Sequence, residues 1–377
     1  MAIPLNPEAF PPGEYIREEL ETRGWTQLDL AEILGRPAQA VNEIITGKRS
    51  ISPVMAKALG DAFGTSAQLW INLDGAYQLA RVSAADDSIS RKAKLYEFAP
   101  LKEMQKRGWI EKSSNMEVLE AQILNFFGIP KLGDPIHFQV AARKSTDCGL
   151  ITSSQLAWLY RARNLARAVS VTGKFSDSSL AAALSRLAEA KAEVVEARKV
   201  PTILADAGIR FLVVEPLPQS KIDGVCFWLD RVSPVVVVSF RFDRIDWFWH
   251  ALMHELAHVK NRESMDNPTI DTALVGSDAQ AFDEKTDSEK NADMFAVRFL
   301  IDQVKFESFI ARVHPLYSKR KIVAFAARVH VHPGIVVGQL QFRKKIQYAH
   351  SREFLVKVRD VVTAASLADG WGEPVWV

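Results

Sequence analysis

Short groups of apolar residues three or four positions apart run through the first 85 residues, which is the spacing of one helix face. They predict four short helices, at about residues 11–23, 26–35, 37–47 and 52–64. Thr26 begins the second helix with Asp29 three residues on, which is the spacing of a capping box, and Gly35 ends it. The apolar residues of this helix are expected to be buried: Leu28, Leu30, Ala31, Ile33 and Leu34.

The pattern changes further along the chain. Residues 86–200 are mostly helical in pattern and include an amphipathic stretch at 178–198, which should end before Pro201. Three β-strand candidates follow at 209–215, 225–229 and 235–240, and the last two are spaced as a hairpin. Helices are expected at about 243–260 and 287–301. Strands followed by helices favour an α+β fold.

We therefore expect a multidomain chain, since 377 residues exceed the usual size of one domain. An all-α domain would span residues 1–85, a mostly helical connecting region 86–200, and an α+β domain 201–377. The sequence leaves open whether the connecting region is a domain of its own or the flank of the next one.

Composition narrows the class of protein. The chain is 48% hydrophobic and 24% charged, which is typical of a globular protein, and its net charge of +2 indicates no global basic surface. The start has no basic run followed by an apolar segment, and no apolar stretch approaches the roughly 18 residues of a membrane span. Cys148 and Cys226 form no metal or redox motif. We expect a cytoplasmic protein with no membrane partner.

The predicted helix at 243–260 contains the sequence His254-Glu-Leu-Ala-His258. Residues four apart lie one above the other on a helix, so both imidazoles can bind one metal ion. Glu255 lies beside them and can act as the general base that takes a proton from water. This is the histidine spacing of zinc metalloproteases.

A catalytic zinc ion needs a third protein ligand and an open position. Glu289 and Asp293 lie four apart on the next predicted helix, whose apolar residues would dock it against the first. Glu289 would bind the metal, and Asp293 would accept the free N–H of a ligand histidine, His254. Two such acidic residues usually form only a solvated helix face, and it is the upstream motif that favours the metal interpretation.

Both motifs together resemble the ImmA/IrrE family of metallopeptidases, whose pattern is His-Glu-x-x-His followed by Glu-x-x-Ala-(Asn/Asp)-x-Phe-Ala. The resemblance covers roughly residues 201–345. It implies a zincin-like fold of the gluzincin kind, with zinc ligands at His254, His258 and Glu289 and a catalytic glutamate at Glu255. Members of this family typically cleave a DNA-binding repressor and so switch on genes.

Other residues near the motif have open roles. His250 lies one helical turn before His254 and could touch substrate or metal, although such a histidine is more often simply packed. His330, His332 and Tyr317 are candidates for stabilising an oxyanion. One edge of the 225–240 hairpin could receive the substrate as an added strand, with Phe227 and Trp228 on opposite faces; the alternative is that both strands are internal.

The segment from Thr26 to Lys48 has the form of a helix-turn-helix and resembles the Cro/repressor family, most closely HigA-type antitoxins, over about residues 5–82. The resemblance assigns base or phosphate contacts to six residues: Gln27, Arg36, Gln39, Asn42, Lys48 and Arg49. Residues 1–80 contain six basic and ten acidic residues, a net charge of −4, whereas DNA binding normally needs a basic face. The alternative is a helix-turn-helix used only for dimerisation or protein contact.

The sequence thus predicts a homodimeric regulator that binds DNA at its own promoter or operator. It would use zinc and Glu255 to cleave a protein substrate, either a repressor or a partner from a toxin system. The rival interpretation is an antitoxin-like repressor whose peptidase-like domain senses or binds a partner without cleaving it.

Overall fold

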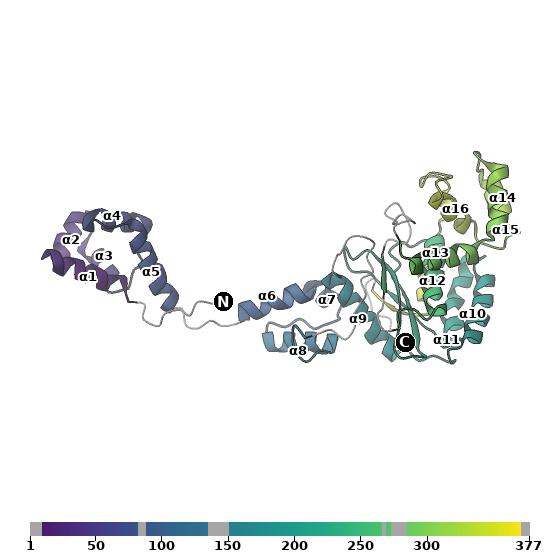
Figure 1. Ribbon diagram of the computed structural model, residues 1–377, viewed down its shortest axis with the longest axis horizontal. Helices are drawn as coiled ribbons and strands as arrows, with labels where there is room; N and C mark the ends of the chain where they lie inside the picture. Colours follow the sequence, from purple (N-terminus) through teal and green to yellow (C-terminus); the bar gives the residue numbers. More distant parts are fainter. Residues whose placement is uncertain (1–9, 82–87, 135–150, 266–268, 273–284, 371–377) are drawn as a thin grey trace. The chain divides into compact units, whose positions relative to one another are not determined.

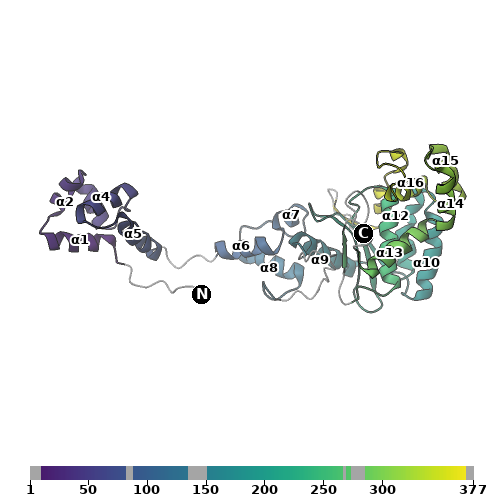
Figure 2. The ribbon, with the colours of Figure 1, turned by 45° about the horizontal axis from the view of Figure 1, so that its top comes forward.

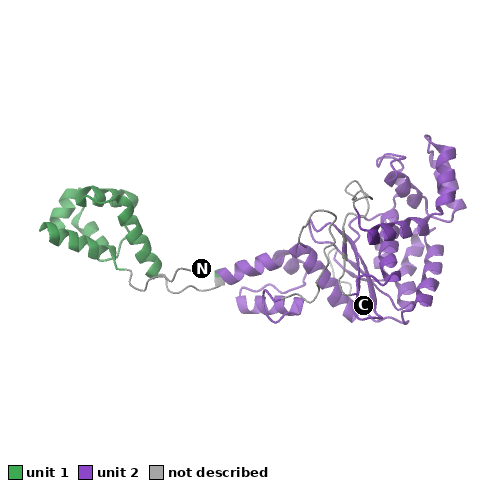
Figure 3. Cartoon of the chain, viewed as in Figure 1, with its two compact units in different colours: residues 1–89 green, residues 90–377 purple. Residues whose placement is uncertain are grey.

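The computed structural model describes residues 10–81, 88–134, 151–265, 269–272 and 285–370. The chain forms two compact units, residues 1–89 and 90–377, which are coloured separately in Figure 3. The unit boundary lies close to the end of the predicted all-α domain. Residues 90–200 are part of the second unit, which answers the question that the sequence leaves open.

The described residues 10–81 of the first unit form five helices (Figure 1). Their bounds are α1 (Pro12–Arg23), α2 (Gln27–Leu34), α3 (Ala38–Ile45), α4 (Pro53–Phe63) and α5 (Ala67–Arg81). The capping box of Thr26 and Asp29 is present, and Gly35 ends α2 with the positive φ of 59° that favours glycine. Gly13 permits α1 to pack against α3, because a Cβ there would collide with the backbone of Ile45.

One expectation for α2 is wrong. Leu30 and Ala31 are buried, but Leu28 is 69% exposed and Ile33 is 49% exposed. A helix of eight residues that crosses its neighbours at one short contact buries only a narrow stripe, so apolar residues to either side remain in solvent.

The second unit is built on a five-stranded mixed sheet of order β4-β2-β3-β1-β5. Its strands are β1 (Arg210–Val214), β2 (Ile222–Trp228), β3 (Pro234–Val238), β4 (Thr269–Thr272) and β5 (Leu367–Asp369). The predicted hairpin is confirmed, because β2 and β3 pair antiparallel, with Val225 opposite Val237. Both strands are nevertheless internal, since β2 also pairs with β4 and β3 also pairs with β1. The hairpin therefore has no open edge for a substrate.

Helices cover both faces of this sheet (Figures 1 and 2). Side chains alternate between two cores: Val225 and Phe227 of β2 join one, and Cys226 and Trp228 join the other. The first core is completed by α8 (Met116–Phe127) and α9 (Ser153–Ala168). The indole N–H of Trp158 on α9 donates to the carbonyl of Val214 on β1 at 3.2 Å. Phe227 and Trp228 lie on opposite faces, as expected, and both are buried.

The other face is covered by helices that include α12 (Ile245–Lys260). The expected single helix at 178–198 is instead α10 (Asp177–Ala190), the 3-10 turn η1 (Val194–Lys199) and α11 (Val200–Asp206). Pro201 lies in the first turn of α11, where its missing N–H costs nothing, so it begins a helix rather than following one.

The remaining elements flank these layers. They are α6 (Ser88–Phe98), α7 (Leu101–Lys106), α13 (Asp287–Leu300), α14 (Gln303–Val313), α15 (Lys319–Arg328), α16 (Pro333–Phe342), η3 (Arg352–Phe354) and α17 (Arg359–Thr363). Of the helices that the structure describes, none is both long and apolar enough to cross a membrane.

Candidate metal centre and helix-turn-helix surface

The two predicted motif helices, α12 and α13, pack against each other and bring their polar residues together. α12 is buried along most of its length between the sheet and its helical neighbours. Contacts run from His258 to Glu289 at one end and from His250 to Asp293 further along, so the two helices are antiparallel. The polar residues of α12 at 250, 254 and 258 thus face those of α13.

Three potential ligand atoms converge at this contact. His254 Nε2 lies 3.1 Å from His258 Nε2 and 3.1 Å from Glu289 Oε2, and His258 Nε2 lies 3.8 Å from Glu289 Oε1. Ligand atoms about 2.05 Å from a tetrahedral zinc ion would be about 3.3 Å from one another. The structure therefore groups the three residues that the sequence nominates as ligands, at separations that one zinc ion could occupy.

Carboxylates hold the outer nitrogen of both imidazoles. His254 Nδ1 is 2.9 Å from Asp293 Oδ1, and His258 Nδ1 is 2.6 Å from Glu263 Oε2. An ionised carboxylate only accepts hydrogen bonds, so each Nδ1 carries the hydrogen and each neutral ring presents its Nε2 lone pair. Two lone pairs facing each other at 3.1 Å require a cation or a proton between them. The donor set thus fits a metal ion.

Electrostatics at the site agree with this hydrogen-bond pattern. Burial raises the pKa of Asp293, but hydrogen bonds with His250 and His254 outweigh burial and hold that pKa well below its usual value. The hydrogen bond with His258 lowers the pKa of Glu263. For His254, burial lowers the pKa, yet the bonds to Asp293 and Glu289 prevail and raise it to about 9. A metal ion that binds His254 Nε2 must displace any proton there.

Glu255 follows His254 in the sequence, about a quarter turn further round α12, and is fully buried beneath β2. Its carboxylate packs so closely on Gly224 that a Cβ at this position would collide with it. Gly224 is a site residue that the sequence analysis missed. A glycine within a strand is a signal of close approach, but the sequence alone does not say what approaches.

The sequence also gave no indication of Glu263 and Lys285, which lie at the candidate site together with His250. Glu263 lies beyond the end of α12 and also accepts from Ser288 Oγ at 2.5 Å. Lys285 Nζ lies 2.6 Å from Asp293 Oδ2 and balances its charge. His250 Nε2 lies 3.6 Å from Asp293 Oδ1, so His250 borders the centre next to the carboxylate that orients His254.

The candidates for stabilising an oxyanion have other contacts. His332 Nδ1 accepts the backbone N–H of Gly334 and caps α16. Tyr317 packs against Phe309 and has its hydroxyl 3.5 Å from His314 Nδ1. His330 lies just after α15 and has a positive φ of 53°. A role in oxyanion stabilisation stays a prediction for all three residues.

On the first unit, all six predicted DNA-contact residues are exposed: Gln27, Arg36, Gln39, Asn42, Lys48 and Arg49. They lie on α2, α3 and the turns that follow these helices. The sequence did not indicate a competing interaction. Glu43 accepts from Gln39 Nε2 at 3.1 Å and lies 3.7 Å from Arg49 NH1. An acidic group therefore lies within the proposed DNA surface.

Comparisons with known proteins align with this first unit. The helix-turn-helix family model matches residues 16–70. The HTH-type transcriptional regulator YddM of Escherichia coli is 31% identical over 84 residues, which are 22% of this chain and 88% of that protein. Virulence-associated protein I of Dichelobacter nodosus is 35% identical over 94 residues, 24% of this chain and 87% of that protein.

Solved structures of the same kind are also similar. The Pseudomonas aeruginosa antitoxin HigA, solved with the higBA promoter, is 37% identical, covering 25% of this chain and 99% of its own, with a TM-score of 0.20. PA4674 from P. aeruginosa, solved in complex with its operator DNA, is 42% identical over 20% of this chain and 84% of its own, with a TM-score of 0.20.

The chain belongs to the helix-turn-helix family through its N-terminal unit. The matches named here do not extend into the second unit beyond its first residues, so the interpretation of the metal centre rests on the residues and geometry described above.

Glu263 supplies the first testable prediction. Replacing Glu263 by Ala removes the acceptor that holds His258 Nδ1–H, so zinc affinity should fall about 10–100-fold in a competition titration with a chelator. Glu353→Ala serves as the control, because Glu353 pairs with Lys319 through exposed side chains. Equal zinc affinity in wild type and Glu263→Ala would show that this carboxylate does not orient a ligand.

The second testable prediction concerns Gly224. The methyl group of Gly224→Ala must displace the Glu255 carboxylate, so peptide hydrolysis should fall at least about tenfold while zinc content stays at one ion per chain. Gly75→Ala is the matched control, because a Cβ there meets nothing within 4 Å. Hydrolysis at the wild-type rate by a folded Gly224→Ala variant would contradict a catalytic role for this contact.

Proposed function

We propose that the protein is a zinc-dependent endopeptidase joined to a DNA-binding transcriptional regulator. The observation that carries the proposal is the convergence of His254, His258 and Glu289, with both imidazoles held by ionised carboxylates. These three residues would hold the zinc ion. When bound, the ion would supply Lewis acidity to a substrate carbonyl and lower the pKa of water.

The chain's own residues would supply proton transfer and orientation. Glu255 would take a proton from the attacking water and pass it to the leaving amine. Asp293 and Glu263 would fix the tautomers of His254 and His258. Gly224 would set the position of the Glu255 carboxylate. The substrate would be a protein, either a repressor or a partner in a toxin system, in keeping with a helix-turn-helix regulator in the same chain.

One observation favours the alternative, a regulator whose second unit binds a partner without cleaving it. Glu255 is fully buried, whereas a general base must meet water and substrate. Catalysis therefore requires β2 and its surroundings to admit water to the Glu255 carboxylate. A protein that only senses or binds a partner has no such requirement, so proteolysis must be measured directly.

For the first unit we propose binding to operator DNA, including that of its own promoter, as a symmetric dimer. Support comes from the helix-turn-helix family, from the similarity to a transcriptional regulator and from the exposure of all six proposed contact residues. Gln39 and Asn42 would contact bases, because amide side chains both donate and accept in the major groove. Gln27, Arg36, Lys48 and Arg49 would contact phosphates.

The peptidase proposal predicts distinct outcomes for ligand and base variants. His254→Ala and His258→Ala should lose zinc, because each removes one of three ligands. Glu255→Gln should keep about one zinc ion per chain and lose proteolysis, because the amide cannot accept the proton. Metal analysis and cleavage of co-expressed partner proteins measure both properties. Full zinc retention in both histidine variants would refute the metal site. If the zinc-loaded wild type does not cleave any partner protein, the result favours a second unit that binds its partner without cleaving it.

The DNA proposal predicts different effects for base and phosphate contacts. Gln39→Ala should relax sequence preference by about 1–3 kcal/mol at one base position. Lys48→Ala should weaken binding to all sequences alike. It should also reduce the slope of the logarithm of the binding constant against the logarithm of the salt concentration by about one. Lys57→Ala is the control, because Lys57 lies on α4 and pairs with Asp61. If the full chain shows no salt-dependent binding to its promoter, the helix-turn-helix serves protein contact instead.

A further inference from the structure

The row of residues that forms the metal centre continues along the contact between α12 and α13. His250 lies one turn before His254, with ring centroids 6.3 Å apart, and Asp246 lies one turn further. Because the helices are antiparallel, the α13 residues opposite this part of α12 are Val297 and Leu300. Unlike the residues at the metal end, these two are apolar.

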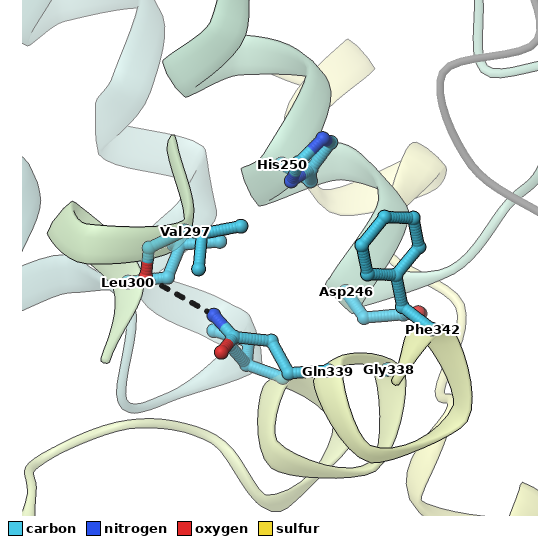
Figure 4. Close-up of a pocket in the computed structure, with 8 residues that line it drawn as sticks. Asp246, His250, Val297, Leu300, Gly338, Gln339 and Phe342 are labelled. Atoms are coloured by element: carbon cyan, nitrogen blue, oxygen red, sulfur yellow. Dashed lines mark hydrogen bonds between the residues drawn. The ribbon is translucent and has the colours of Figure 1, made fainter. Parts of the chain in front are cut away.

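A cavity opens along this stretch. Its outer part has a volume of about 310 Å³ and is bordered by His250, Asp293, Met294, Val297, Arg298 and Phe342. An inner part of about 40 Å³ shares His250, Val297 and Phe342 with it and extends to Asp246, Leu300 and Gly338. Figure 4 shows His250 of α12, Val297 of α13 and Gln339 of α16 arranged around this inner part.

Hydrogen bonds fix the wall that α16 contributes. Gln339 Nε2 donates to the carbonyl of Val297 at 3.2 Å, the bond drawn in Figure 4. Gln303 Nε2 donates to the same carbonyl at 2.9 Å, and Arg343 in turn donates to Gln303 Oε1. Three helices are thereby tied together around the cavity. It is preformed, as cavities that bind ligands usually are.

The side chains that line the cavity indicate which kind of ligand it can bind. Met294, Val297, Leu300 and Phe342 make the walls mostly apolar. Asp246 at the inner end already has a cation, since its carboxylate lies 3.0 Å from Arg244 Nε and 2.6 Å from Arg244 NH2. The outer part is bordered by Arg298, which would repel a basic side chain, and by Arg343, whose charge Glu307 already balances. A large, uncharged apolar side chain fits this combination best.

We infer that this cavity binds a large apolar side chain of the peptide substrate, such as Leu, Met or Phe, about two residues from the bond that is cut. The offset follows from the 6.3 Å between the His250 and His254 rings, because an extended chain rises about 3.3 Å per residue. The inference rests on the proposed peptidase function and adds the substrate preference of that site. Val297 and Phe342 are its specificity-determining residues.

The experiment uses the full zinc-loaded chain and peptides with a Gly, Ser and Ala scaffold that carry Leu, Ala, Lys or Asp at each position in turn. Val297→Phe fills the cavity, and Phe342→Ala removes one wall. Val304→Phe is the matched control, because Val304 is 81% exposed on α14. Cleavage is measured as kcat/KM for the wild type and these variants. Binding is measured by fluorescence anisotropy with Glu255→Gln, alone and combined with each cavity variant.

We expect wild type to prefer Leu over Ala two residues from the cut by roughly tenfold or more. Val297→Phe should abolish or reverse this preference and Phe342→Ala should weaken it, with zinc content unchanged and Val304→Phe like wild type. If the protein cleaves peptides but neither Val297→Phe nor Phe342→Ala alters its preference, the inference is overturned and the peptidase proposal stands.

Binding separates the remaining outcomes. If wild type does not cleave, but Glu255→Gln binds the Leu peptide more tightly than the Ala peptide and Val297→Phe removes the difference, the cavity assignment holds and the peptidase proposal fails. If the chain neither cleaves nor binds these peptides, both are overturned.

Discussion

The antiparallel packing of α12 against α13 is the contact on which the candidate metal centre depends. His254 and His258 come from one helix and Glu289 and Asp293 from the other, so neither helix forms the site alone. Small residues at the contact, among them Ala292 and Ala296, are fully buried and permit the close approach. Burial of apolar surface around α12 supplies the stability, and the polar row is then held at separations that suit one metal ion.

The sheet covers the face of α12 that carries Glu255. β2 is covered on both faces and paired on both edges, which keeps the strand rigid over the helix. Gly224 lets the Glu255 carboxylate pack directly against the strand. The position of the Glu255 carboxylate thus depends on a residue of the sheet as much as on the helix that carries it. It also means that the hairpin cannot receive a substrate strand, whereas β4, which pairs with β2 alone among the described strands, is the free edge on this side.

Features set by local sequence could be predicted, and features set by tertiary packing could not. The capping box at Thr26, the β2–β3 hairpin and the shared helix face of His254 and His258 follow from short spacings and appear in the structure. Glu289 joins the two histidines through the packing of a second helix, which its own motif indicated. Glu263 lies in a turn without periodicity, so no pattern connects it with His258. The exposure of Leu28 and the position of Pro201 in the first turn of α11 depend on how neighbouring helices cross, which propensity and periodicity do not encode.

Asp293 in the second unit and Glu43 in the first are both acidic residues with polar partners, but the difference in their burial makes the first interaction strong and the second weak. Asp293 lies among His250, His254 and Lys285 in the protein interior, and removing one partner of a buried ion pair costs about 3–5 kcal/mol. That carboxylate therefore fixes the ring of His254. Glu43 contacts Gln39 and Arg49 near the surface, where such pairs contribute about 0–1 kcal/mol. A bidentate base contact is worth about 1–3 kcal/mol, so DNA can displace Glu43 from Gln39. The net negative charge of the first unit is thus compatible with DNA binding, although it lowers the affinity for DNA.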